Sequence, residues 1–153
     1  MKNNEFKIDA EAGVITFAQM AHGNMFVSKA KVGGSDQFNI GVGQLIAMKR
    51  NEIAIRRVDI QEMRRITTTL NDILSKVPKN DPENGGIIRR LFVDFTRQVY
   101  VKINASLNHV RELKKDIRQL ERGEYDLPEG IKLGTHMYVV IDGSVKVVPI
   151  EQR

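Results

Sequence analysis

The sequence contains no cysteine and no tryptophan, only four prolines, and aromatic residues make up 6% of it. Without cysteine the chain forms neither a disulfide framework nor a thiolate nucleophile, and a reducing compartment is its natural environment. No apolar run approaches the ~20 residues that a transmembrane helix needs, and the N-terminal residues lack the apolar core of a secretion signal. We therefore expect a cytoplasmic protein with no membrane partner.

The sequence also lacks a recognisable catalytic motif. Its three histidines fall in a predicted turn, a helix and a strand, and no two of them are one helical turn apart. The Gly-x-Gly of residues 41–43 has neither a third glycine nor a preceding βαβ unit, which excludes a dinucleotide fingerprint. Glu112 and Asp116 are explained by intrahelical ion pairs with neighbouring lysines. We expect no enzyme, no catalytic residue, no metal site and no cofactor, although a site without a named motif stays an open alternative.

Two long helical stretches are what the chain does contain, and we predict them over residues 38–76 and 87–122. Apolar residues recur at seven-residue spacing in both, at Ile46, Ile53 and Ile60 and at Ile103, Val110 and Ile117. A loop rich in Pro, Asn and Gly separates them, so the pattern predicts an antiparallel helical hairpin resembling a coiled coil. Each helix would be ~55 Å long, whereas a compact chain of this size has a radius of gyration of about 15 Å. Either a helix breaks or a partner copy covers the pair, and we predict a homo-oligomer.

Alternating apolar and polar residues predict a β-hairpin at each end of the chain. In the first hairpin Gly23 and Asn24 tolerate the positive φ of a tight turn, and in the second Asp142-Gly143 is a strong turn signal. Asp36 suits the N-cap of the first helix. The prediction is an α+β fold in one domain, residues 1–153, with a β-hairpin (1–35), a helical hairpin (36–123) and a second β-hairpin (124–153). Pairing the two hairpins into one four-stranded sheet is the simplest way to stabilise both.

Arginine dominates the charge of the predicted helices. They carry sixteen Lys and Arg against eight Asp and Glu, and eleven of the sixteen are Arg. A guanidinium group presents a planar fork that matches phosphate and carboxylate oxygens and also stacks on flat rings. An ordinary solvated helix surface, with Phe92 simply in the core, is the open alternative. The candidate ligand-binding residues are Arg56, Arg57, Arg64, Arg89, Arg90, Phe92, Arg97, Arg111 and Arg118.

Residues 25–50 resemble a stretch of small accessory proteins of Gram-positive phages. The segment covers about one sixth of the chain, and the matching residues within it are Ala30, Lys31, Asp36, Phe38, Asn39, Gly43, Leu45, Ala47 and Arg50. Some accessory proteins of this kind are anti-defence sponges, including the anti-Thoeris kind, which combine β-strands with long helices. The resemblance implies sequestration of a cyclic ADP-ribose-type signal without cleavage, in the cytoplasm of the host cell. None of that family's ligand residues is transferred to this sequence.

These observations lead to one main functional hypothesis and two alternatives. The main one is a phage-type, non-enzymatic oligomer whose arginine-edged helices bind a small anionic nucleotide. The first alternative is a nucleic-acid-binding protein that uses the same basic helices. The second is an inhibitor that docks onto a host protein, for which Ile55 and Val58 would matter more than arginine, because they point away from the apolar stripe of their helix.

Overall fold

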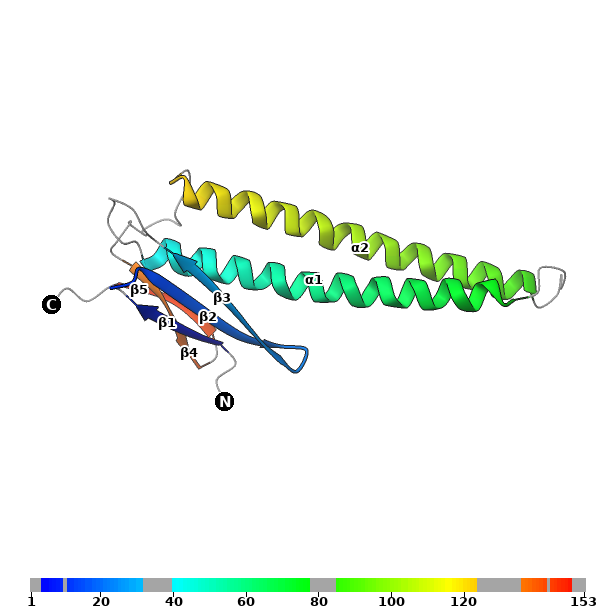
Figure 1. The fold of residues 1–153 in the computed structure, drawn as a ribbon, viewed down its shortest axis with the longest axis horizontal. Helices are drawn as coiled ribbons and strands as arrows, with labels where there is room; N and C mark the ends of the chain where they lie inside the picture. Colours follow the sequence, from blue (N-terminus) through cyan, green and yellow to red (C-terminus); the bar gives the residue numbers. More distant parts are fainter. Residues whose placement is uncertain are drawn as a thin grey trace. The chain divides into compact units, whose positions relative to one another are not determined.

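The computed structural model describes residues 4–9, 11–31, 40–77, 85–123, 136–142 and 144–149 (Figure 1). Its elements, in chain order, are β1 (Asn4–Asp9), β2 (Val14–Ala21), β3 (Asn24–Lys31), α1 (Ile40–Ser75), α2 (Gly85–Glu121), β4 (His136–Ile141) and β5 (Ser144–Pro149). The chain divides into two compact units. Unit 1 comprises residues 1–55 and 112–153, unit 2 comprises residues 56–111, and both long helices contribute to each.

The α+β class, the two long helices and the C-terminal hairpin are confirmed. The helices begin and end within two residues of the predicted positions, at 40 and 75 for α1 and at 85 and 121 for α2. The predicted cap Asp36 lies outside the described residues. No helix in the described part of the chain is long and apolar enough to cross a membrane.

The N-terminal strands form a three-stranded sheet, not the predicted hairpin. β1 pairs antiparallel with β2, and β2 pairs antiparallel with β3, in the order β1-β2-β3. The inward residues of β1 alternate with charged ones, which obscured the strand in the sequence. Phe6 nevertheless packs on Phe17 of β2 with 4.7 Å between ring centroids.

The turn between β2 and β3 is shifted by one residue from the predicted Gly23-Asn24. Ala21 pairs with Asn24 in the register, so the two turn residues are His22 and Gly23. Both have positive φ, 51° and 74°, as a type I′ turn requires. In the C-terminal hairpin Ile141 pairs with Ser144, which confirms a two-residue turn whose first member, Asp142, has a φ of 50°.

The predicted four-stranded sheet is wrong, because β4 and β5 form a separate two-stranded sheet. The edge of β4 that would pair with another strand is occupied by a side chain of α1. Gln44 donates from Nε2 to the Tyr138 carbonyl, and its Oε1 accepts the Tyr138 N–H. One side-chain amide thus takes the place of a neighbouring peptide group, so β4 needs no third strand at this point. Burial raises the pKa of the Tyr138 phenol above its ordinary value.

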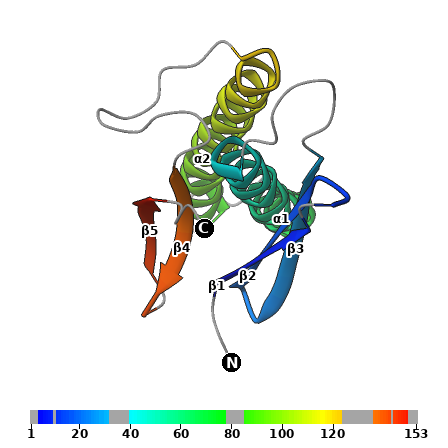
Figure 2. The ribbon, with the colours of Figure 1, turned by 90° about the vertical axis from the view of Figure 1, so that its left-hand side faces the viewer.

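The first part of α1 forms the centre of unit 1 (Figure 2). Its buried apolar residues, together with those of the three-stranded sheet, are Val42, Ile46, Ala47 and Ile53 with Ile15, Phe17 and Ala30. Asn51 is also fully buried and accepts a hydrogen bond from Ser28 Oγ at 3.0 Å, while its Nδ2 donates to Gln19 Oε1 at 3.4 Å. Buried amides of α1 therefore reach both sheets.

Two ion pairs join the end of α2 to α1 within unit 1. Lys49 Nζ lies 3.3 Å from Asp116 Oδ2. Arg50 donates to the Lys29 carbonyl and to Glu121 Oε1, both at 2.8 Å. These cations, which interrupt or border the predicted apolar stripe of the first helix, thus have partners from β3 and α2.

Replacing Gln44 with leucine tests the role of the side-chain amide at the β4 edge. The variant leaves the Tyr138 N–H and carbonyl without partners, and each buried unpaired group costs about 1–3 kcal/mol. We expect Gln44→Leu to lower the free energy of unfolding by about 2–4 kcal/mol in urea titrations followed by circular dichroism. Gln119→Leu, at an exposed position of the same unit, is the control. Equal stability of the two variants would contradict the assignment.

Gly23→Ala tests the turn between β2 and β3. A Cβ at this position meets no atom within 4 Å, so any loss of stability comes from the positive φ of 74° alone. We expect the unfolding free energy to fall by about 1 kcal/mol. Gly86→Ala, where a Cβ also meets nothing within 4 Å and which lies in α2, should not destabilise the protein. A neutral Gly23→Ala variant would argue against the type I′ turn.

Candidate functional site

Unit 2 consists of α1 from Arg56 onward and α2 up to Arg111, joined by the predicted loop. Each helix buries one stripe of side chains against the other. The fully buried members of this inner stripe are Ile60, Thr67, Val99, Ile103, Ser106 and Val110. The seven-residue spacing of Ile103 and Val110 in the sequence therefore identified the packed side of α2 correctly.

The helices run antiparallel in unit 2, and contacts fix their alignment. Arg89 Nη2, near the start of α2, donates to the Val77 carbonyl just beyond α1 at 2.6 Å. Farther along, Asn71 of α1 and Arg97 of α2 line the same cavity. Positions closer to the N-terminus of α1 therefore lie opposite positions closer to the C-terminus of α2.

One side of the pair carries five arginines and one carboxylate at its outer edge, that of Asp72, which pairs with Lys76 Nζ at 3.3 Å, and we call it the cationic face. Successive helical residues are rotated by about 100°, so the residues of this face lie roughly 30° to 150° from the inner stripe in one direction. On α1 they recur at alternating intervals of four and three, as Arg57, Gln61, Arg64, Thr68, Asn71 and Ser75. On α2 they are Arg89, Val93, Arg97, Tyr100, Asn104, Leu107 and Arg111.

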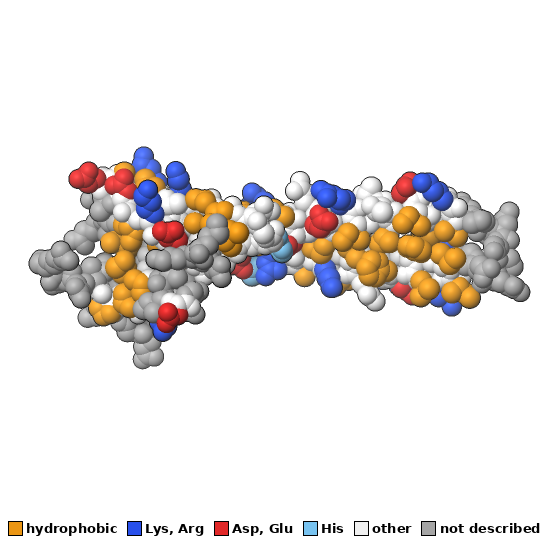
Figure 3. Space-filling model, turned by 90° about the horizontal axis from the view of Figure 1, so that it is seen from below, with side chains coloured by type: hydrophobic (Ala, Val, Ile, Leu, Met, Phe, Trp, Pro, Cys, Tyr) orange, Lys and Arg blue, Asp and Glu red, His pale blue; other side chains and the backbone are white. Residues whose placement is uncertain are grey.

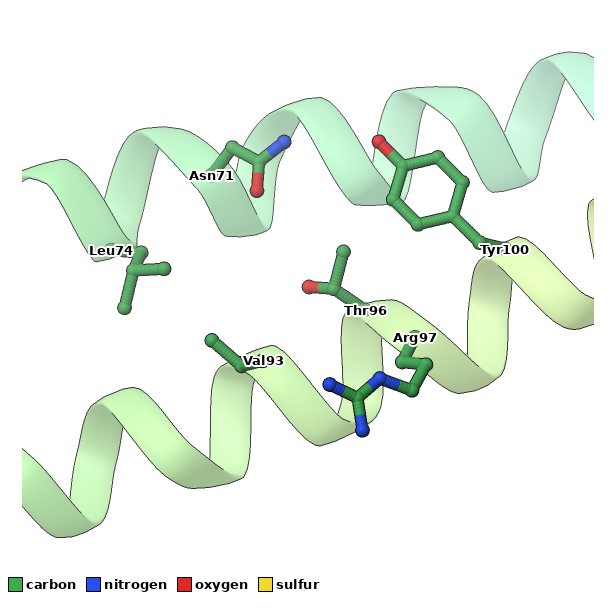
Figure 4. A pocket seen from close by; sticks show the side chains of 6 residues that line it. All are labelled: Asn71, Leu74, Val93, Thr96, Arg97 and Tyr100. Atoms are coloured by element: carbon green, nitrogen blue, oxygen red, sulfur yellow. The ribbon is translucent and has the colours of Figure 1, made fainter.

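A cavity of about 280 Å³ opens between the helices on this face (Figure 4). It is lined by Asn71, Leu74, Val93, Thr96, Arg97 and Tyr100. Tyr100 reaches from α2 toward α1, and the residue as a whole is 47% exposed. Arg97 lies over α2 beside the cavity. A flat ring, an amide, a hydroxyl and a guanidinium group thus converge on one largely apolar hollow.

A pair of arginines lies farther along the cationic face. Arg57 is 14 residues before Asn71, and Arg111 is 14 residues after Arg97, so the alignment places the two arginines opposite each other. Both are exposed. Arg111 Nη1 donates to Asn108 Oδ1 at 3.1 Å. Among the described residues no carboxylate pairs with either arginine.

Five of the eight predicted arginines lie on the cationic face of unit 2: Arg57, Arg64, Arg89, Arg97 and Arg111. Arg89 is half-buried there, and its buried Nε has no partner within the described structure. Its hydrogen bond to the Val77 carbonyl shows a structural task as well, because it satisfies a backbone group beyond the end of α1.

The remaining predicted residues lie elsewhere. Arg56 is half-buried on the inner-stripe side of α1, and Arg90 is exposed on the outer side of α2. Arg118 is exposed and belongs to unit 1. Phe92 is half-buried in line with the inner stripe and does not line the cavity.

Sequence analysis missed the cavity residues other than Arg97. Phe92, Phe95 and Tyr100 all lie close to arginines in the sequence, and Phe92 was the one selected as a candidate, whereas Tyr100 is the aromatic residue at the cavity. The sequence does contain a signal for the cationic face. The α1 positions from Arg57 to Ser75 that are spaced alternately four and three residues apart share one side of a helix, and none of them is a carboxylate.

No family model, curated protein or solved structure matches this chain. In the part of the chain that the structure describes, no three His, Asp or Glu side chains are grouped so that they could hold a metal ion. Function is therefore argued from the geometry of the cationic face and its cavity.

Proposed function

We propose that the protein is a non-enzymatic binding protein that sequesters a small anionic nucleotide on the cationic face of unit 2. The observation that carries the proposal is the cavity that both Tyr100 and Arg97 line, on a face whose one carboxylate, Asp72, is paired with Lys76. A phage-type anti-defence sponge in the cytoplasm of a host cell, acting as a homo-oligomer, is the biological setting that this activity suits.

The cavity offers separate contacts for the two halves of a nucleotide. The base stacks on the exposed part of the Tyr100 ring, with Leu74 and Val93 as the apolar wall. Asn71 and Thr96 supply hydrogen-bonding groups at the base or sugar. The Arg97 guanidinium binds phosphate oxygens through its paired N–H groups, and the nearest carboxylate of this face in sequence, Asp72, is already paired with Lys76.

Sequestration requires recognition and no bond cleavage. The cavity lining contains a tyrosine, an arginine and neutral side chains, which bind an anion well. Such a set holds the ligand through charge and stacking, and it supplies neither a carboxylate nor an imidazole as general base. The chemistry of the lining thus suits a sponge better than a hydrolase.

Binding of defined nucleotides tests this proposal. Calorimetric titration uses cyclic ADP-ribose isomers and cyclic dinucleotides as probes. We expect binding of at least one of them. Arg97→Ala should weaken it by about 10-fold or more, because a charge-assisted hydrogen bond contributes about 1.5–3 kcal/mol. Tyr100→Leu should weaken it by about 5-fold or more, because stacking of a base on an aromatic ring contributes about 1–3 kcal/mol. Tyr100→Phe keeps the ring and should bind nearly as well as the parent protein.

Arg90→Ala is the matched control, since Arg90 is an exposed arginine of α2 outside the cationic face. It should leave the affinity unchanged. The proposal fails if none of the probes gives heat, or if Arg90→Ala weakens binding as much as Arg97→Ala does.

Nucleic acid is a second candidate ligand, and the length of the cationic face favours it. Arg57 and Arg111 lie 14 residues of helix away from the level of the cavity, which is ~21 Å at 1.5 Å per residue. One small nucleotide does not span this distance, whereas consecutive phosphates of a strand do. Exposed arginines in a row without carboxylates between them are what such a backbone requires.

The salt dependence of oligonucleotide binding separates the two candidates. If a strand lies along the cationic face, replacing both Arg57 and Arg111 with glutamine removes about two phosphate contacts. The slope of log K against log salt then becomes less steep by about 1.4–1.8, depending on whether the strand is single or double. Arg65→Gln, at an exposed position whose arginine pairs with Glu62, is the control. No gel shift at low salt, or an unchanged slope in the double variant, would exclude nucleic acid.

A further inference from the structure

The side of unit 2 opposite the cationic face is apolar and exposed. Its residues lie about 40° to 100° from the inner stripe in the other direction, by the same count of about 100° per residue. We call this surface the apolar face, and its members are Ile66, Leu70, Ile73 and Val77 of α1 with Ile88, Leu91 and Phe95 of α2. Leu91 is 65% exposed, Phe95 50% and Ile73 42%. Figure 3 shows the hydrophobic side chains gathered over the helices toward the end where α1 stops and α2 begins.

The width of the apolar surface on each helix indicates how many neighbours the helix is built for. A helix that packs against one partner needs a narrow stripe, at about two positions in seven. A helix in a four-helix bundle contacts two neighbours and needs about three in seven. In unit 2 both helices have the inner stripe and the adjacent apolar face, yet unit 2 contains only two helices. Each helix therefore has the pattern of a bundle member that lacks one neighbour.

Charge determines which surface suits a second copy of the same chain. The cationic face repels another cationic face, because it carries five arginines against one carboxylate. The border of the apolar face has both signs, with Asp59 and Glu62 on α1 and Lys102 on α2. A surface with an apolar centre and a mixed border is compatible with its own copy, as a two-fold interface requires.

The area of the apolar face matches one half of an ordinary dimer interface. At their exposed fractions the seven side chains present on the order of 500 Å² of apolar surface. A stable complex buries about 800 Å² on each partner, and about 65% of a homodimer interface is apolar. The apolar face thus supplies nearly all of the apolar area that a homodimer of standard size needs.

We propose that a second copy of this chain covers the apolar face. The two copies of unit 2 then form a four-helix bundle in which Leu91 and Phe95 lie at the interface. Both cationic faces point outward, so each copy keeps its cavity open to solvent. This assembly names the surface through which the homo-oligomer of the proposed function forms, and it stands whether or not the cationic face binds a nucleotide.

Sedimentation of the full chain tests the proposal. At micromolar concentration we expect a particle of twice the 17.4 kDa chain mass, or an even multiple of it. Leu91→Glu and Phe95→Glu should reduce the mass at least to half. Val101→Glu is the matched control, because Val101 is 64% exposed on α2 and lies on neither face. It should leave the mass unchanged.

Milder variants keep the test decisive if the glutamate variants do not fold. Leu91→Ala should raise the dissociation constant of the dimer at least 10-fold, and Val101→Ala should not change it. A single-copy particle of the parent protein, equal effects of the Leu91 and Val101 variants, or assembly only with a foreign protein would each overturn the proposal.

Nucleotide titration distinguishes a failure of this inference from a failure of the proposed function. A monomeric Leu91→Glu variant that folds should still bind the nucleotide probe of the parent protein, since the cavity lies on the other face. Arg97→Ala should lose nucleotide affinity and keep the mass of the parent protein. Loss of assembly in Arg97→Ala would contradict the assignment of separate faces.

Discussion

A helix can bury only as many of its sides as it has neighbours, and this constraint governs the whole chain. In unit 1 the first four turns of α1 contact two sheets and the end of α2, so side chains around most of its circumference are buried, even polar ones such as Gln44 and Asn51. Among the described residues of unit 2, the same helix has α2 as its neighbour. One stripe is then buried and two flanks remain, one cationic and one apolar, and these flanks are the surfaces to which we assign the two proposed binding roles.

Buried amides explain how unit 1 joins elements that share no backbone ladder. Gln44 meets both polar groups of one residue in β4, and Asn51 meets side chains of β2 and β3. A buried peptide group without a partner is costly. A side-chain amide on a helix can supply the missing hydrogen bonds at the edge of a sheet, so that no further strand is needed there. The five strands therefore form two sheets around one helix, although a single sheet would use backbone groups alone.

The elements that are long or strongly periodic could be predicted from the sequence. The features that depend on contacts between residues distant in the sequence could not. Both long helices and the Asp142-Gly143 turn follow from local patterns. β1 was missed because Glu5, Lys7 and Asp9 dilute its apolar residues, and only pairing with β2 makes it a strand. The arginines were found as a class, but their distribution was not, since Arg56 and Arg57 are adjacent in sequence and face different sides of α1. Phe92 was selected over Tyr100 although both lie within three residues of an arginine, because their positions around the helix, which place only Tyr100 at the cavity, were not compared.

Tyr100 also has a spectroscopic consequence. The sequence has three tyrosines and no tryptophan, so the ultraviolet emission of the folded protein comes from phenol rings alone. Tyr138 is half-buried in unit 1, Tyr125 lies outside the described residues, and Tyr100 lines the cavity. A ligand ring stacked on Tyr100 would quench the part of this emission that comes from Tyr100. Occupancy of the proposed nucleotide site could thus be followed by tyrosine emission, free of the stronger indole fluorescence that would mask it in most proteins.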